Sequence, residues 1–265
     1  MKISLLPYNY SFGTTSRSFI NSDNRKVQTT TYMFREDLKW DEFSDYIVKH
    51  FKNKDKVNFI QFASSDGSEA YTQIISLLEK HKDNDKFFPI QAYDIDKENV
   101  RAAQSGLLNI HRSDHNAMDA LSIVLKKYLL ATDHKLHLNN DTYINLSDDT
   151  KLDFVVKTYK VSPTLTNRVN FHHADMFDIL KNLEDDSNTI LMCRNILGHF
   201  STNRFREFID LAAEKLKKGS LLVIGSHDTV FIQNERYIEE KGFVKVMENV
   251  YRKRFNFKST FTSSK

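Results

Sequence analysis

The sequence has very little cysteine, and it has no long apolar run. Its single cysteine, Cys193, excludes an internal disulfide and is typical of a protein kept in a reducing compartment. No apolar run is long enough to cross a bilayer, and the polar N-terminus lacks the apolar centre of a signal peptide. We therefore expect a cytoplasmic protein without membrane insertion.

A strong excess of one charge is also absent. The 38 Lys and Arg residues and 35 Asp and Glu residues leave a net charge of only +3. The basic residues do not form a stripe with interleaved aromatics, so nucleic acid is not an expected partner. His and Cys do not cluster at zinc spacing, and the adjacent His172 and His173 would point to opposite faces of a strand. We therefore expect no bound metal.

Glycine is scarce, and the chain has no short-period repeat. With 265 residues, 40% of them hydrophobic, the chain can form one sizeable α/β domain. The sequence contains seven glycines, and most fall where elements are expected to end. A sequence so sparing with glycine favours a backbone requirement at each of them, such as a left-handed cap or a close ligand approach.

Residues 57–72 are the stretch around which the rest is organised. Residues 57–62 favour a buried strand, and residues 74–78 carry an apolar stripe at helical spacing. The turn between them contains Ser65 and Gly67, which would let a ligand approach the backbone, and a helix start favours anionic groups. In an open α/β sheet, such a turn lies at the carboxyl end of a strand, where ligands bind. A plain strand-to-helix connection is the alternative reading.

A second strand, residues 87–93, is followed by two acidic residues. An acidic residue at a strand tip, after a glycine-containing turn, is suited to bind ribose hydroxyls. Asp96 is expected to cap the next helix, which leaves Asp94 for a ligand. Upstream, Arg35 precedes an amphipathic helix over residues 40–51. A cation there opposes the helix dipole, which favours another use for Arg35 over a plain surface charge.

The remaining pattern predicts an interrupted α/β chain. A helix is expected over residues 116–131, and short alternating segments within residues 132–165 predict a small inserted antiparallel sheet, typical of a lid or a partner-binding lobe. Strand and helix alternation resumes afterwards and closes with a hairpin. We expect an N-terminal arm at 1–30, a main domain at 31–257 and a loose tail at 258–265. The later elements are predicted at 169–173, 189–193, 202–217, 221–225, 243–247 and 250–257.

Several motifs occur in an order and spacing that resembles the CheR-type chemotaxis receptor methyltransferase family. The landmarks extend over most of residues 30–230, and together they are more specific than any of them alone. They are Phe34-Arg35, the run from Ser65 to Tyr71, Asp94-Ile95-Asp96 with Ala103 and Gly106, Cys193-Arg194-Asn195 with Phe200, residues 216–225, and Asp228.

The resemblance implies a class I S-adenosylmethionine-dependent methyltransferase with a Rossmann-like fold. That fold has a seven-stranded, mostly parallel sheet with helices on both faces. The implied reaction forms methyl esters on glutamate side chains of chemoreceptors and releases S-adenosylhomocysteine. By position, the resemblance implies that the cofactor is bound by Ala63, Ser65, Gly67, Glu69, Asp94, Ile95, Asp175, Met176, Asn195 and Ile196, with Arg35 near the reacting groups.

Two departures from the family leave alternatives open. His199 stands where the family typically has tyrosine, so it is either a structural histidine or a group that orients the acceptor or removes its proton. Glu69 either binds the cofactor's ammonium or is a solvated helix residue. Only some thirty residues precede the Phe-Arg motif, where the family has a receptor-docking helical domain. A different protein or small-molecule acceptor, or a non-catalytic signalling module, therefore remains an alternative.

Overall fold

The main sheet has seven strands. The structure is a computed structural model, and it describes residues 15–20, 26–31, 33–82, 84–111, 122–136, 156–184, 188–229 and 232–255. The strand order is β11-β12-β10-β9-β3-β4-β8. The strands are β3 (Asn58–Phe62), β4 (Ile90–Asp94), β8 (Val169–His173), β9 (Thr189–Cys193), β10 (Leu221–Ile224), β11 (Phe243–Met247) and β12 (Val250–Lys253).

The strand directions confirm the predicted fold class. The strands from β10 to β8 are parallel, whereas β12 is antiparallel to both of its neighbours. The chain adds β4 and β8 on one side of β3, and then returns to add β9 and β10 on the other side. The order therefore reverses between β3 and β9. In open α/β sheets, ligands bind at such a switch point, beyond the carboxyl ends of the strands.

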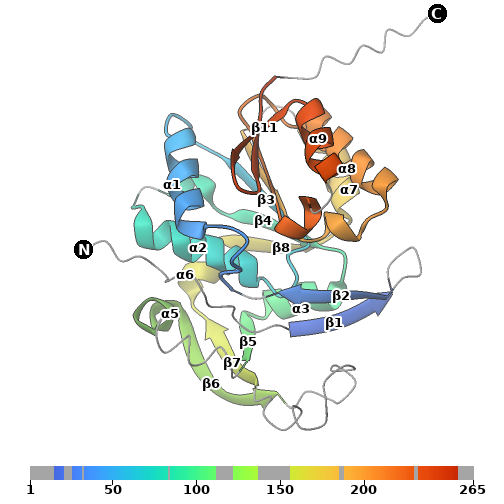
Figure 1. Cartoon of the computed structure of the whole chain (residues 1–265). Helices are drawn as coiled ribbons and strands as arrows, with labels where there is room; N and C mark the ends of the chain where they lie inside the picture. The colour runs from blue at the N-terminus through green and yellow to red at the C-terminus, as the bar shows by residue number, and fades with distance from the viewer. Residues whose placement is uncertain are drawn as a thin grey trace, which may run out of the picture.

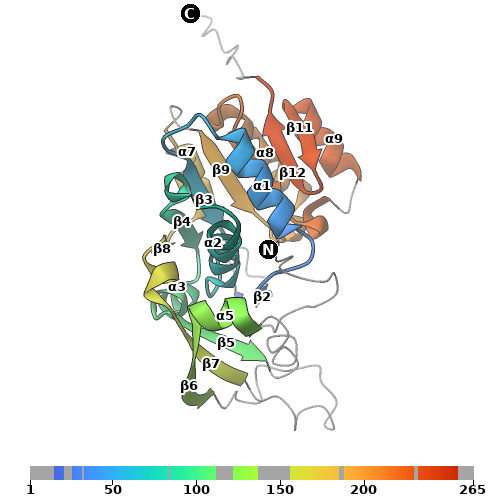
Figure 2. The ribbon, with the colours of Figure 1, turned by 90° about the vertical axis from the view of Figure 1, so that its left-hand side faces the viewer.

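The sheet is apolar on both faces because successive strand residues point to opposite sides. In β9, Ile190 and Met192 join the core cluster on one face, and Leu191 and Cys193 join the cluster on the other. Figures 1 and 2 show the helices that cover these faces. The first face is covered by α1 (Trp40–His50) and α2 (Ser68–Lys80), and the second by α7 (Met176–Lys181), α8 (Thr202–Lys215) and α9 (Ile232–Glu240).

Shorter elements complete the main domain. α3 packs against β4 and β8. These elements are α3 (Lys97–Gln104), α6 (Pro163–Thr166), η1 (Asp85–Phe87), η4 (Leu197–His199) and η5 (Ser226–Thr229). Within the part of the chain that the structure describes, every helix is too short or too polar to cross a membrane.

A separate antiparallel sheet is inserted between α3 and β8, as Figure 1 shows. Its strands, in the order β5-β7-β6, are β5 (Leu107–His111), β6 (Leu129–Leu136) and β7 (Val156–Val161), and α5 (Ser122–Tyr128) precedes β6. The small antiparallel sheet was predicted, but β5 lies upstream of the predicted insertion. Residues 112–121 and 137–155, with parts of the predicted helix and strands, lie outside the described residues.

The prediction of a helix as far as residue 131 is wrong at its C-terminal end. Leu129 and Ala131 pair with Val161 and Tyr159 of β7. The chain from residue 129 therefore belongs to strand β6, and the last predicted helical turn does not form. A helical spacing of apolar residues could not reveal this, because tertiary pairing overrides local propensity.

Two strands lie within the predicted N-terminal arm. β1 (Thr15–Ile20) and β2 (Lys26–Thr31) pair antiparallel over their whole length. The stretch is polar, yet it is rich in threonine, whose branched side chain suits a strand. The rest of residues 1–30 and the predicted tail at 258–265 lie outside the described residues.

Candidate functional site

The loop between β3 and α2 is tightly folded. Ala63 and Ser65 have φ angles of 53° and 49°, and Gly67 has a φ of 89°. A non-glycine residue in this left-handed region costs on the order of 1–3 kcal/mol and persists only where its surroundings hold it. A Cβ on Gly67 would lie 2.6 Å from a ring atom of Phe171, so glycine is required there. The loop conformation is thus imposed by neighbouring strands.

Asp94, at the tip of β4, is one of the groups that hold this loop. Its side chain is buried, and its Oδ2 and Oδ1 accept the backbone N–H groups of Ser65 and Asp96, each at 2.8 Å. Burial raises the pKa of the Asp94 carboxyl, and these two hydrogen bonds oppose the rise. A carboxylate has about four acceptor positions, so Asp94 retains capacity for further donors such as hydroxyl groups.

Arg194, directly after β9, joins two carboxylates. Its buried side chain donates from Nη1 to Glu69 Oε2 at 2.6 Å and from Nη2 to Asp37. The guanidinium carbon also lies 4.8 Å from the centre of the Trp40 ring, in cation–π range. A buried cation with two anionic partners is compensated, whereas without it Glu69 would lose its ion-pair partner and Asp37 would keep only Arg35. Arg194 therefore fixes both acids at the strand tips.

The two carboxylates beside Arg194 are shifted in opposite directions. Burial acts to raise the pKa of Asp37, but the charge of Arg194 and a hydrogen bond from Asn195 contribute to a net lowering. Burial dominates for Glu69, whose pKa is raised despite Arg194, and the charge of Asp37 adds to the rise. Gln61 donates to Glu69 at 3.2 Å. Asp37 is thus firmly ionised, whereas Glu69 would gain from a further cation.

Asp228, in η5, ties the ends of β9 and β10 together. It is completely buried and accepts three backbone N–H groups, from Asn195 at 2.7 Å, Gly198 at 2.9 Å and Gly225 at 2.7 Å. These bonds hold Asn195 in the left-handed region, at a φ of 57°. A Cβ on Gly225 would lie 2.2 Å from Asn195 Oδ1. Gly225 therefore makes room for the Asn195 side chain.

The sequence matches the model of a known protein family. The family model described as the CheR methyltransferase, SAM binding domain, matches residues 29–246, which is more than half of the chain. The chain belongs to this family. Its cofactor is S-adenosylmethionine and its class is that of an S-adenosylmethionine-dependent methyltransferase, so both sequence predictions are confirmed. No curated protein matches the sequence.

Solved structures of methyltransferases are similar to this chain at low identity. An O-methyltransferase family protein from Burkholderia thailandensis is 13% identical over 83% of this chain and 60% of that chain, with a TM-score of 0.40. An S-adenosylmethionine-dependent methyltransferase from Clostridium acetobutylicum is 10% identical over 71% and 50%, with a TM-score of 0.33. Magnesium protoporphyrin IX methyltransferase from Synechocystis, with SAM bound, is 12% identical over 80% and 76%, with a TM-score of 0.34. The chain thus spans 60% and 50% of the length of the first two.

The side chains at the strand tips of this CheR-family chain fit S-adenosylmethionine. We propose Asp94 for the ribose hydroxyls and Glu69 for the ammonium group, because each carboxylate retains acceptor positions. Ser64 Oγ, in the loop between them, is buried without a partner among the described residues. Ile95 follows Asp94 and is 49% exposed, which suits an apolar ring such as adenine. The set matches the sugar, the amino-acid part and the base.

The other predicted site residues lie around this set. Arg35 Nε lies 3.6 Å from Asp37 Oδ1, and His199 is exposed in η4. Asp175 caps α7 by accepting the N–H of Phe177 at 2.7 Å. The remaining two are half-buried: Met176, which begins α7 and whose sulfur is 4.0 Å from Cys193 Sγ, and Ile196, which precedes η4. Their roles stay predictions.

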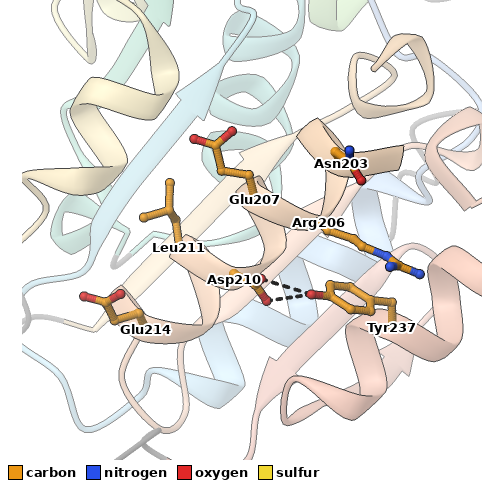
Figure 3. Close-up of a pocket in the computed structure, with 7 residues that line it drawn as sticks. All are labelled: Asn203, Arg206, Glu207, Asp210, Leu211, Glu214 and Tyr237. Carbon is orange, nitrogen blue, oxygen red and sulfur yellow. Dashed lines mark hydrogen bonds between the residues drawn. The ribbon is translucent and has the colours of Figure 1, made fainter. Parts of the chain in front are cut away.

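A surface hollow of about 430 Å³ lies elsewhere. Figure 3 shows that its lining comes from α8 and α9, where Tyr237 donates to both oxygens of Asp210, at 2.9 and 3.0 Å. The hollow contains none of the strand-tip residues, so it is separate from the cofactor site. Among the described residues, no group of three or more His, Cys, Asp or Glu side chains is gathered as a metal ion would require.

Three residues of the site were missed as functional residues by sequence reasoning. Arg194 and Asp228 were noted as family landmarks, and Asp37 was not singled out. A usable signal did exist for Arg194, because it directly follows the apolar run from Ile190 to Cys193. A cation at that place is buried unless the strand ends at the surface, and a buried cation needs anionic partners. Nothing local marks Asp37, whose partner Arg194 is 157 positions away.

We expect the affinity for S-adenosylhomocysteine to decline on acidification. The pKa of Glu69 in the folded protein is raised above its ordinary 4.5, so this carboxyl takes up a proton where a free glutamate is still ionised. A neutral Glu69 no longer attracts an ammonium group, so affinity is full above that pKa and is lost as the pH falls through it. Calorimetric titration between about pH 8 and pH 5 measures the decline.

The Glu69→Gln variant is the control for this pH dependence. It should bind more weakly at neutral pH and show a shallower decline. It keeps the part of the decline that is due to Asp94, whose pKa is also raised by burial. A decline as steep as in the unmodified protein would assign the effect to another group.

Proposed function

We propose that this protein transfers a methyl group from S-adenosylmethionine to a glutamate carboxylate of a protein acceptor, such as a chemoreceptor or another signalling protein. The observation that carries the proposal is the pair of carboxylates on either side of one strained loop, Asp94 buried and Glu69 half-buried. Asp94 bonds the loop directly at Ser65, and Glu69 lies in the first turn of the helix that the loop begins. Family membership supports the acceptor class. A cytoplasmic location is part of the proposal.

The reaction requires alignment more than acid or base chemistry. When bound, the cofactor supplies a methyl group that becomes bonded to a carboxylate oxygen, while the electron pair of the broken C–S bond stays on sulfur. A carboxylate acceptor is already ionised, so the protein has no proton to remove. Arg35 is proposed to orient that carboxylate, because a guanidinium can donate two parallel hydrogen bonds to it. Asp37, 3.6 Å from Arg35 Nε, limits where that guanidinium can lie.

The acceptor can be tested with labelled S-adenosylmethionine. The purified protein is incubated with a cytoplasmic chemoreceptor fragment, and separately with cell extract, and the product is treated with mild alkali. A methyl ester releases its label as methanol, so we expect base-labile label on protein. Label that survives alkali would replace the carboxylate by a nitrogen or hydroxyl acceptor, with His199 as the candidate for removing the proton. Failure to bind S-adenosylhomocysteine in calorimetry would instead favour a non-catalytic module.

A further inference from the structure

The Asp37 side chain connects the segment before α1 to the segments that follow β9 and β10. Oδ1 accepts from Arg194 and lies 3.6 Å from Arg35 Nε. Oδ2 accepts from Asn195 Nδ2 at 2.8 Å and from the N–H of Ser226 at 3.3 Å. These partners follow β9 and β10 or precede α1. Three hydrogen-bond donors and the nearby cation of Arg35 surround the carboxylate, so little of its acceptor capacity is left for a ligand, and we infer that its task is to hold other groups.

The backbone of this segment is fixed as firmly as the carboxylate. The carbonyl oxygen of Asp37 accepts from Asn249 Nδ2 at 2.6 Å, in the turn between β11 and β12. Trp40 Nε1 donates to the carbonyl oxygen of Arg35 at 3.0 Å, while its ring covers Arg194. Because its backbone is held in this way, Asp37 keeps its position relative to the sheet. It therefore anchors one arm of the Arg194 guanidinium.

Because Arg194 is shared between Asp37 and Glu69, only one oxygen of Glu69 is paired with it. Each Glu69 oxygen has one donor among the described residues: Gln61 on Oε1 and Arg194 on Oε2. Without the charge of Asp37, the second arm of the guanidinium would lose its anion. Arginine pairs with a single carboxylate in a bidentate fork, so Arg194 would then engage both Glu69 oxygens. Glu69 would be less available to a second cation.

We propose that Asp37 is a positioning residue for methyl transfer: it holds one arm of Arg194, so that Glu69 stays available for the ammonium group of the cofactor. This inference rests on the proposed cofactor site. In this proposal Asp37 acts through Arg194 and is given no contact of its own with substrate or cofactor. We expect its main effect at the amino-acid end of the ligand, through Arg194 and Glu69, because none of the hydrogen bonds or ion pairs of Asp37 among the described residues involves Asp94 or Ile95 at the sugar and base end.

The test compares two ligands in calorimetry. S-adenosylhomocysteine carries the amino-acid part with its ammonium group, whereas 5′-methylthioadenosine has the same sugar and base without it. In the Asp37→Asn variant, the Kd of S-adenosylhomocysteine should rise about tenfold, a typical effect for one weakened charged contact, and that of methylthioadenosine should stay unchanged. Combined with Glu69→Gln, the Asp37→Asn change should add little, because both act on one contact.

The outcomes separate this inference from general damage and from the proposed function. Glu36→Gln, at an exposed neighbour, is the matched control and should bind both ligands normally. Equal weakening of both ligands by Asp37→Asn would mean a purely structural role and overturn the inference. The inference would also be overturned if the unmodified protein bound S-adenosylhomocysteine and the Asp37→Asn variant bound both ligands with unchanged affinity. If the unmodified protein bound neither ligand, the cofactor site itself would be refuted, and this inference with it.

Discussion

Replacing Arg194 with methionine is expected to lower the free energy of unfolding by about 3–5 kcal/mol, the range for removing one partner of a buried ion pair. Methionine fills a similar volume, but it leaves Glu69 without its ion-pair partner and leaves Asp37 with only the more distant Arg35. Without the guanidinium of Arg194 between them, the two carboxylates repel one another more strongly. Urea unfolding near neutral pH measures the loss, with the midpoint and the slope fitted separately.

The pH dependence of this loss identifies its cause. The pKa of Asp37 is lowered in the folded protein, so its stabilisation is present above its unfolded value of 3.8 and is lost as the pH falls through the folded value. In Arg194→Met the part of this stabilisation that is due to the charge of Arg194 is missing at neutral pH. The difference between the two proteins should therefore shrink on acidification.

A matched control is available for this change. Arg254 is exposed and lies outside the site, so Arg254→Met should leave the free energy of unfolding within about 0.5 kcal/mol. If the Arg194→Met variant were as stable as the unmodified protein at neutral pH, the charge of Arg194 would not be needed to balance Asp37 and Glu69, and our interpretation would be wrong.

The second large effect is expected at Asp94. Asp94→Asn should weaken the binding of S-adenosylhomocysteine about 100-fold, or roughly 2.7 kcal/mol, as expected when a buried charged acceptor is lost and a donor is left facing a donor. The amide NH2 must face either the N–H of Ser65 or that of Asp96, both of which now donate to the carboxylate. Calorimetry measures the affinity, and circular dichroism checks the fold.

Asp96→Asn is the control for Asp94→Asn. Asp96 lies two residues away and caps α3 by accepting the N–H of Glu98 at 2.8 Å, which an asparagine can also do. Its affinity should remain within a factor of about two, since cap residues of this kind exchange at little cost. Equal losses in both variants would point to a distorted β4–α3 connection instead of a lost acceptor.

Sequence reasoning recovered the elements whose signal is local. β10 is a continuous apolar run, β3 and β4 are short segments with mostly apolar residues, the closing hairpin is two β-favouring segments around a turn, and Asp96 is a cap followed by a helix. The family resemblance supplied the cofactor, and the family match confirms it. α9 was not predicted, since its window from residue 232 to 240 is mostly polar and shows a weak apolar stripe.

The acid–arginine cluster could not be predicted, because its members come together only in three dimensions. Glu69 and Arg194 are 125 positions apart, and Asp37 and Asn195 are 158 apart. In the sequence, each of these four residues looks like an ordinary charged or polar residue near the end of a helix or strand. The parallel neighbourhood of β3 and β9 brings them together, and that strand order depends on packing that a single sequence does not display.

The contact between Asn249 and the carbonyl of Asp37 has a consequence for biosynthesis. The residue lies in the final hairpin, whose second strand also inserts next to β10. During translation, the early strands can collapse long before that hairpin leaves the ribosome. The segment that carries Arg35 and Asp37 therefore gains its hydrogen bond to Asn249 only after the hairpin has been made. A nascent chain without the hairpin would lack this contact at the proposed site.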